Sequence, residues 1–180
     1  TYMGDLNEFY ERAAVMGDPG DSGISTVITA RYVENIMEAY GMEDINLKIS
    51  GSSWTSWMEN QLDEGVSYFQ YRGFYGVSGF DNGDIDDVNN GHKLPFATVL
   101  TCGTGSFAQE STCLSEKFLR AGSASNPRGA IAAVCTATGN THTMFNNIIA
   151  MGIYDGIFAK KLGTAGAALA NGKLTLFSAY

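Results

Sequence analysis

The sequence predicts an α/β fold, a three-layer sandwich with a mostly parallel β-sheet and helices on both faces. Short apolar segments rich in β-branched residues alternate along the chain with longer segments of helical periodicity. Such alternation is typical of parallel strands joined by helical crossovers. Turn residues separate the segments, and 44% of the 180 residues are hydrophobic. We therefore interpret residues 1–180 as a single domain that can bury a sizeable core.

The first predicted long helix ends at Gly41. Residues 17–23, which precede it, are dense in Gly, Asp and Ser and are expected to form a loop. Val27 and Ile36 belong to one apolar helical face, and Gly41 supplies the stop. Residues 6–14 are predicted as a short helix or as the remainder of a longer element.

Two strands and a helix are predicted in the next part of the chain. Residues 45–49 alternate apolar with polar side chains and indicate a strand, residues 53–65 indicate a helix, and residues 66–71 indicate a second strand. A sharp turn at 73–76 follows that strand. Residues 81–91 are acidic and polar, which favours a loop with one helical turn.

Cys102 follows a predicted buried strand at residues 96–100. Gly103 and Gly105 interrupt the strand, and a helix is expected from about Gln109. The thiol is thus predicted to lie where a parallel strand meets a loop, at the sheet edge where ligands usually bind. A small buried core residue at a strand end is the alternative interpretation.

The last part of the chain predicts one more strand and two helices. Residues 130–135 indicate a buried strand, residues 136–143 a polar loop, and residues 145–162 and 164–180 two helices. Because the carboxyl ends of parallel strands share one edge, the loop at 136–143 is expected to lie beside the turn after 66–71 and the Cys102 loop.

Composition excludes some classes of function. A net charge of -8 opposes phosphate backbones, so we expect no nucleic-acid partner. No apolar run is long enough to span a bilayer. Three cysteines lack metal-site spacing. The chain opens at Thr1 without a signal peptide, so it is expected to be a processed or trimmed part of a longer precursor.

Five short motifs occur in a defined order. They are Tyr71-Arg72-Gly73-Phe74-Tyr75-Gly76, Leu94-Pro95-Phe96, Cys102-x-x-Gly105-x-Phe107, Cys113-x-x-Glu116-x-x-x-Arg120-Ala121 and Arg128-Gly129-Ala130-Ile131-Ala132. In this order and spacing the chain resembles the gingipain-type cysteine peptidases of peptidase family C25. The resemblance covers roughly residues 15–158 and is strongest over 94–121.

The resemblance implies a caspase-like fold and a secreted or cell-surface enzyme that cleaves peptide bonds through a Cys–His dyad. Cys102 falls on the nucleophile, and the backbone amides of Tyr75 and Cys102 fall on the oxyanion donors. The residues that it places around the substrate are Thr26, Arg72, Gly73, Phe74, Gly103 and Thr104.

Three positions depart from the family pattern. Phe74 occupies the position of the catalytic histidine, and phenylalanine cannot accept a proton. Val15 falls near the position of the carboxylate that supports this histidine. Thr26 stands where arginine-specific members have an aspartate, so a preference for arginine or lysine is not expected.

The chain has two histidines that could replace the missing base, and Arg72 and Tyr75 are other groups near Cys102 that could assist the thiol. His142 is expected at the same sheet edge as Cys102 and could form a dyad with it, or it could be a polar loop or helix-capping side chain. His92 is expected at the opposite edge. Arg72 cannot take a proton but could favour a thiolate electrostatically.

The sequence thus predicts a cysteine-type endopeptidase that acts on peptides or proteins through Cys102 and His142. The alternative is an inactive peptidase-fold protein used for peptide binding or extracellular assembly. We expect self-association, or contact with flanking segments of the precursor, to cover exposed strand edges. No cofactor is expected, although residues 81–87 offer clustered oxygen atoms that could bind calcium.

Overall fold

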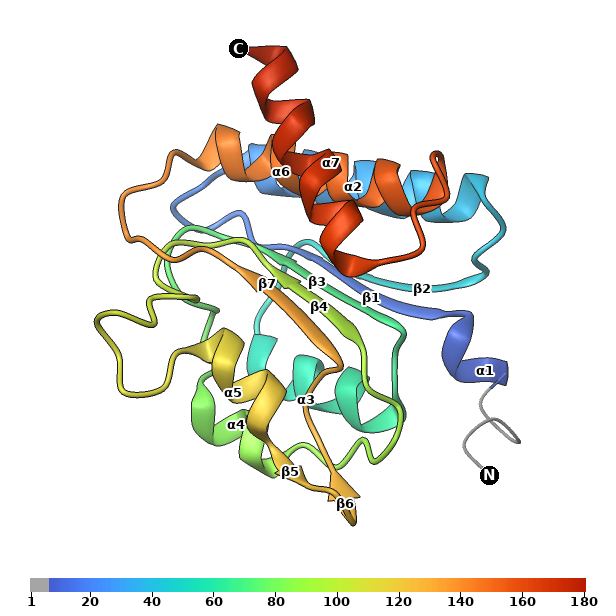
Figure 1. Ribbon diagram of the computed structural model, residues 1–180, viewed down its shortest axis with the longest axis vertical. Coiled ribbons are helices and arrows are strands. Elements are labelled where there is room, and N and C mark those ends of the chain that lie inside the picture. The colour runs from blue at the N-terminus through green and yellow to red at the C-terminus, as the bar shows by residue number, and fades with distance from the viewer. Residues whose placement is uncertain (1–6) are drawn as a thin grey trace.

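A computed structural model describes residues 7–180 and has three layers (Figure 1). A parallel sheet forms the middle layer, and helices cover both of its faces, as the sequence predicts. The strands are β1 (Arg12–Gly17), β2 (Asp44–Lys48), β3 (Tyr68–Arg72), β4 (Phe96–Val99) and β7 (Ala132–Cys135). They are ordered β2-β1-β3-β4-β7, and every neighbouring pair is parallel.

The helices divide between the two faces of the sheet (Figure 1). One face carries α2 (Ile24–Ala39), α6 (Thr143–Phe158) and α7 (Ala165–Ala179). The other carries α3 (Trp54–Glu64), α4 (Asn82–Asp87) and α5 (Leu114–Arg120). The remaining elements are α1 (Asn7–Tyr10) and a small hairpin of β5 (Gly122–Ser123) and β6 (Asn126–Pro127).

The period-two geometry of β1 divides its side chains between two hydrophobic cores. Ala13 and Val15 pack in the core under α2 and α6, whereas Ala14 and Met16 pack in the core under α3 and α5. All four are fully buried. A central strand covered on both faces has no polar alternation, and for this reason its sequence resembles that of a buried helix.

Two predicted elements need correction. Residues 12–17 are a strand, so the helix predicted at 6–14 is confined to α1, and Leu6 lies outside the described residues. The helix after Cys102 starts at Leu114 instead of about Gln109. Residues near Gln109 instead form a tight turn, in which the amides of Gln109 and Glu110 both donate to the Ser106 carbonyl.

Backbone hydrogen bonds join the loops at the carboxyl ends of the strands. Gly105 donates to the carbonyl of Thr136 at 2.9 Å, and Gly103 donates to that of Thr138 at 3.3 Å. Thr104 adds a buried hydroxyl that donates toward the Val99 carbonyl at 2.8 Å and accepts from the Thr136 amide at 3.3 Å. The loops after β4 and β7 are therefore joined side by side, as predicted.

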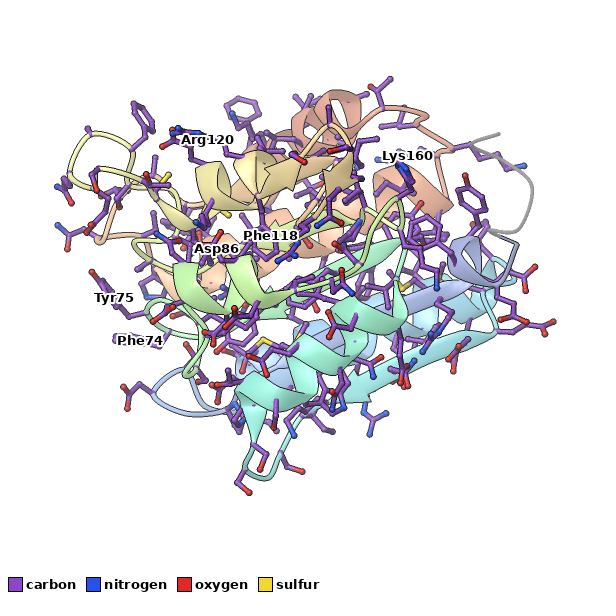
Figure 2. The ribbon with its side chains drawn as sticks, turned by 90° about the horizontal axis from the view of Figure 1, so that it is seen from below. Phe74, Tyr75, Asp86, Phe118, Arg120 and Lys160 are labelled. Atoms are coloured by element: carbon purple, nitrogen blue, oxygen red, sulfur yellow. The ribbon has the colours of Figure 1, made fainter. Side chains whose placement is uncertain are left out.

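Phe118 supplies a test of the hydrophobic core under α3 and α5. The Phe118 side chain is fully buried (Figure 2). Its ring centroid lies 5.9 Å from that of Phe69 and 6.2 Å from that of Phe80. We expect Phe118→Ala to lower the free energy of unfolding by about 3–5 kcal/mol, measured by urea denaturation. The control Leu119→Ala changes a neighbour that is 54% exposed and should change that energy by about 0.5 kcal/mol or less.

Thr104 supplies a test of the loop junction. Thr104→Val keeps the side-chain volume but leaves the buried Thr136 amide without its acceptor. We expect a loss of about 1–3 kcal/mol in the free energy of unfolding. Thr138→Val is the matched control, because the hydroxyl of this exposed residue accepts a long, solvent-exposed hydrogen bond from the Asn140 amide. Equal effects of the two substitutions would show that the junction contributes nothing specific to stability.

Candidate active site

Cys102 lies at the carboxyl edge of the sheet, where its backbone pairs with the turn after β3. Tyr75 and Cys102 form a parallel bridge in which the Cys102 amide donates to Phe74 at 3.3 Å and the Gly76 amide donates to Cys102 at 2.9 Å. The next residue, Gly103, has a φ of 83°, a backbone conformation that favours glycine. The glycine after Cys102 thus allows the chain to turn out of the strand direction at the thiol.

The Cys102 sulfur is held by the loop after β7. Its Sγ lies 3.3 Å from Thr141 Oγ1 and 3.5 Å from the Thr141 carbonyl oxygen. The Thr141 hydroxyl is fixed in turn by Asn146 Nδ2 at 2.9 Å. Cys102 as a whole is 8% exposed. The thiol therefore sits at the meeting point of the three predicted loops and contacts Thr141.

His142 is the N-cap of α6. Its Nδ1 accepts a hydrogen bond from the Met144 amide at 3.2 Å, so in the neutral ring the proton is on Nε2. Among the hydrogen bonds of residues 7–180, none joins His142 to Cys102. The structure places the histidine next to Thr141, which contacts the sulfur, but with its acceptor nitrogen already engaged.

Phe74 and Tyr75 project from the end of the molecule that carries these loops (Figure 2). Phe74 is 52% exposed and Tyr75 is 69% exposed. The Tyr75 amide has no hydrogen-bond partner within residues 7–180, whereas the Cys102 amide is engaged by Phe74. Of the two predicted oxyanion donors, the Tyr75 amide is therefore free in this structure, whereas the Cys102 amide would first have to release the Phe74 carbonyl.

Arg72, by contrast, is fully buried at the end of β3. Its Nε donates to Asn147 Oδ1 at 2.8 Å and one terminal nitrogen donates to the Thr143 carbonyl at 3.2 Å. The other terminal nitrogen, Nη1, is buried without a partner. Burial lowers the pKa of Arg72 to about 10, and the charge of Cys102 acts in the opposite direction.

Two other predicted pocket residues lie inside the turn structure. Thr26 is fully buried, and its hydroxyl lies 2.6 Å from the carbonyl oxygen of Asp18 and 3.0 Å from that of Gly23. Gly73 is buried and accepts a hydrogen bond from the Ser22 hydroxyl at 3.0 Å. Thr26 thus binds backbone carbonyls in this structure.

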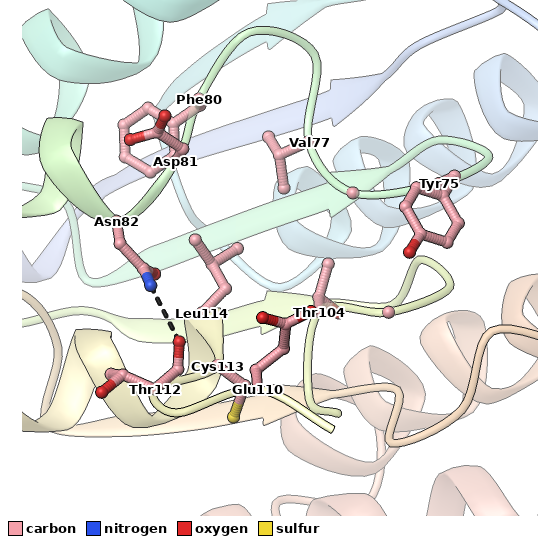
Figure 3. A pocket seen from close by; sticks show the side chains of 12 residues that line it. Tyr75, Val77, Phe80, Asp81, Asn82, Thr104, Glu110, Thr112, Cys113 and Leu114 are labelled. Carbon is pink, nitrogen blue, oxygen red and sulfur yellow. Dashed lines mark hydrogen bonds between the residues drawn. The ribbon is translucent and has the colours of Figure 1, made fainter. Parts of the chain in front are cut away.

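A pocket of about 390 Å³ lies beside the Cys102 loop, between that loop and the start of α4 (Figure 3). Gly103 and Thr104 line it together with Tyr75, while Cys102 itself does not. Glu110 contributes an acidic group. The Cys102 thiol faces Thr141 instead, so the pocket and the sulfur are neighbours across the same loop.

A polar cluster near the site was missed by the sequence reasoning. The Asp18 carboxylate contacts the Ser78 hydroxyl and, at 3.0 Å, the Tyr71 hydroxyl, which also accepts from the Ser78 amide at 3.0 Å. Burial raises the pKa of Tyr71 to about 12. In the sequence, the density of turn residues around Asp18 was the signal that could have pointed to this cluster. This cluster fixes the turn after β3 to the loop after β1.

The acidic segment considered for calcium is used in helix capping and ion pairing. Asp81 caps α4 and forms a capping box with Asp84, and Asp86 pairs with Lys117 at 2.5 Å. In the part of the chain that the structure describes, no group of three His, Cys, Asp or Glu side chains is placed to hold a metal ion.

Solved structures share this fold. The crystal structure of the Arg-specific cysteine proteinase gingipain R matches with a TM-score of 0.84 at 20% identity, over 96% of this chain and 43% of that one. A complex of Porphyromonas gingivalis pro- and mature domains matches with the same TM-score and identity, over 94% of this chain and 43% of the other. These matches establish the caspase-like architecture.

Two gingipains are similar to this chain in sequence. Gingipain R2 and gingipain R1 of Porphyromonas gingivalis are each 23% identical over 125 residues, which are 67% of this chain and 17% and 13% of the relatives. The chain thus spans a small part of the length of these relatives. The model of peptidase family C25 matches residues 2–179. Because the match covers nearly the whole chain, this protein belongs to peptidase family C25.

Proposed function

We propose that this chain is a gingipain-type cysteine endopeptidase domain in which Cys102 is the nucleophile. The observation that carries the proposal is the position of Cys102 in a C25 fold. Its thiol lies where the loops after β3, β4 and β7 converge, with the free amide of Tyr75 nearby. A nucleophile beside a free backbone donor is the arrangement that acyl transfer requires.

The chemistry proceeds by attack of the Cys102 sulfur on the scissile carbonyl carbon. The oxyanion that forms accepts a hydrogen bond from the Tyr75 amide, and collapse of the intermediate releases the amine and leaves a thioester that water hydrolyses. A proton must leave the thiol and reach the amine. His142 is the candidate carrier, and it can take that proton on Nδ1 only by releasing the Met144 amide.

The primary specificity should differ from that of arginine-specific relatives. Thr26 carries no charge and is sealed by backbone contacts, so its position offers no carboxylate to a guanidinium group. We expect no preference for arginine or lysine before the cleaved bond. The proposed substrates are peptides and proteins outside the cell, and the chain is proposed to be secreted or on the cell surface.

Turnover of a mixed peptide library tests the enzyme. We expect the wild-type chain to cleave peptides and Cys102→Ala to abolish cleavage. Because the imidazole carries the proton, His142→Phe should lower the turnover rate by about 10²–10⁴-fold. Mass spectrometry of the products reports the cleavage sites. The control Leu119→Ala changes an exposed side chain away from the pocket lining and should retain turnover.

A second function, peptide binding without turnover, is favoured by a separate observation. Phe74 stands at the catalytic histidine position with 52% of its surface exposed, and His142 is engaged as a helix cap. An exposed aromatic pair at Phe74 and Tyr75, next to the pocket, suits the side chains of an extended peptide.

Peptide affinity separates the two functions. If binding is the function, library peptides bind the wild type and Cys102→Ala equally well and remain intact, and Phe74→Ala weakens binding by about tenfold in fluorescence anisotropy. Leu119→Ala, which is exposed on α5 away from the pocket lining, serves as the control. Cleavage that depends on Cys102 would refute the binding-only function.

A further inference from the structure

The cavity of about 390 Å³ beside the Cys102 loop has no part in the chemistry described above. Its walls come from the turn after β3, the start of α4 and the loop that leads into α5 (Figure 3). Asn82 Nδ2 donates to the Thr112 carbonyl at 2.8 Å, and the Ser115 amide donates to the Thr104 carbonyl at 3.1 Å. These bonds join the walls to one another, so the cavity is formed before a ligand arrives.

The lining of this cavity carries negative charge without positive charge. Asp81 and Glu110 are among the lining residues, which include no lysine, arginine or histidine. The Asp81 carboxylate accepts from the Gly83 amide at 2.6 Å. Among the ion pairs of residues 7–180, none includes Glu110. Glu110 therefore brings an uncompensated carboxylate to the cavity.

The nearby cations of α5 are directed to other partners. Lys117 pairs with Asp86, and Arg120 pairs with Glu116 one helical turn away. Neither cation lines the cavity. A ligand with a positive charge would thus meet the Glu110 carboxylate without competition from a cation in the cavity wall.

Apolar side chains complete the cavity and suit the stem of a long side chain. Val77 and Leu114 are partly buried, and Phe80 is buried. The Tyr75 ring lies against Gly103, where an added Cβ would come within 3.1 Å of the ring carbon Cζ. An aromatic ring beside a carboxylate attracts a cation. A cationic group on an aliphatic stem, as in lysine or arginine, matches both parts of this lining.

The cavity and the Thr26 position belong to different faces of the sheet. Thr26 lies on α2, which covers one face, whereas α4 and α5 cover the other (Figure 1). The Cys102 loop runs between the two sides, since Gly103 and Thr104 line the cavity while the Cys102 sulfur contacts Thr141. An extended peptide with its scissile carbonyl at Cys102 can therefore place a neighbouring side chain in the cavity.

We propose that this cavity binds a lysine or arginine side chain of the peptide at the Cys102 site, with Glu110 as the charge partner of the cationic end. The inference rests on the proposed function because it needs a peptide at the site, and it holds for cleavage and for binding without turnover. The preference concerns a residue other than the one before the cleaved bond, since Thr26 offers no charge there.

Peptide binding to Cys102→Ala, which keeps peptides intact, tests the inference. Labelled hexapeptide libraries carry lysine, norleucine or glutamate at one fixed position, and affinity is measured by fluorescence anisotropy. At one position, lysine should bind about fivefold more tightly than norleucine, which keeps the stem but lacks the charge. Adding Glu110→Gln should reduce the affinity for lysine to that for norleucine. Adding Glu110→Lys should change the preference to glutamate.

Glu38→Gln, in the same Cys102→Ala background, is the matched control. Glu38 is exposed on α2, on the other face of the sheet, and its substitution changes the net charge by the same amount. We expect the preference for lysine to remain. An equal loss with Glu38→Gln and Glu110→Gln would show a general effect of net charge and would overturn the inference. Equal affinities for lysine and norleucine at every position would also overturn it.

A small probe decides the role of the cavity if no library peptide binds, a result that would contradict the proposed function. N-acetyl-lysine methylamide and its norleucine analogue are titrated into the wild type, and the backbone amides are followed by NMR. Saturable shifts of the Gly103 and Leu114 amides with the lysine probe, lost in Glu110→Gln, support the inference. No such shifts, or equal shifts with the norleucine probe, overturn it.

Discussion

The parallel backbone bridge between Tyr75 and Cys102 is the contact on which the candidate site depends. It extends the pairing of β3 and β4 beyond their last regular residues, and it carries the thiol to the rim of the sheet. The Thr104 hydroxyl and the Gly105 amide then tie the same loop to the end of β7. Without these bonds the three loops would share an edge of the sheet but not a common site.

The site combines a largely buried thiol with an exposed aromatic turn and a polar loop. Phe74 is exposed, the Thr26 hydroxyl binds backbone carbonyls, and His142 is committed to the start of α6. The side chain that contacts the sulfur in this structure is Thr141, and the Arg72 guanidinium is buried at the end of β3 against Asn147 and Thr143.

Much of the architecture could be predicted because strand and helix periodicities are strong signals in an α/β chain. β1 was missed because Ala13 to Met16 are buried on both faces and show no alternation. The convergence of the loops could be predicted from the rule that parallel strands end at one edge. The orientation of individual groups could not. Nothing in the spacing of Arg72 revealed that its charge is buried, nor that Thr141 contacts the sulfur.

The capping bond of His142 makes an imidazole ring the acceptor at the start of α6. A substitution that removes Nδ1 leaves the Met144 amide without its partner. The first two turns of α6 also carry Asn146 and Asn147, which hold Thr141 and Arg72. Loss of this cap would therefore loosen the end of one helix and, through it, the scaffold on which the sulfur rests.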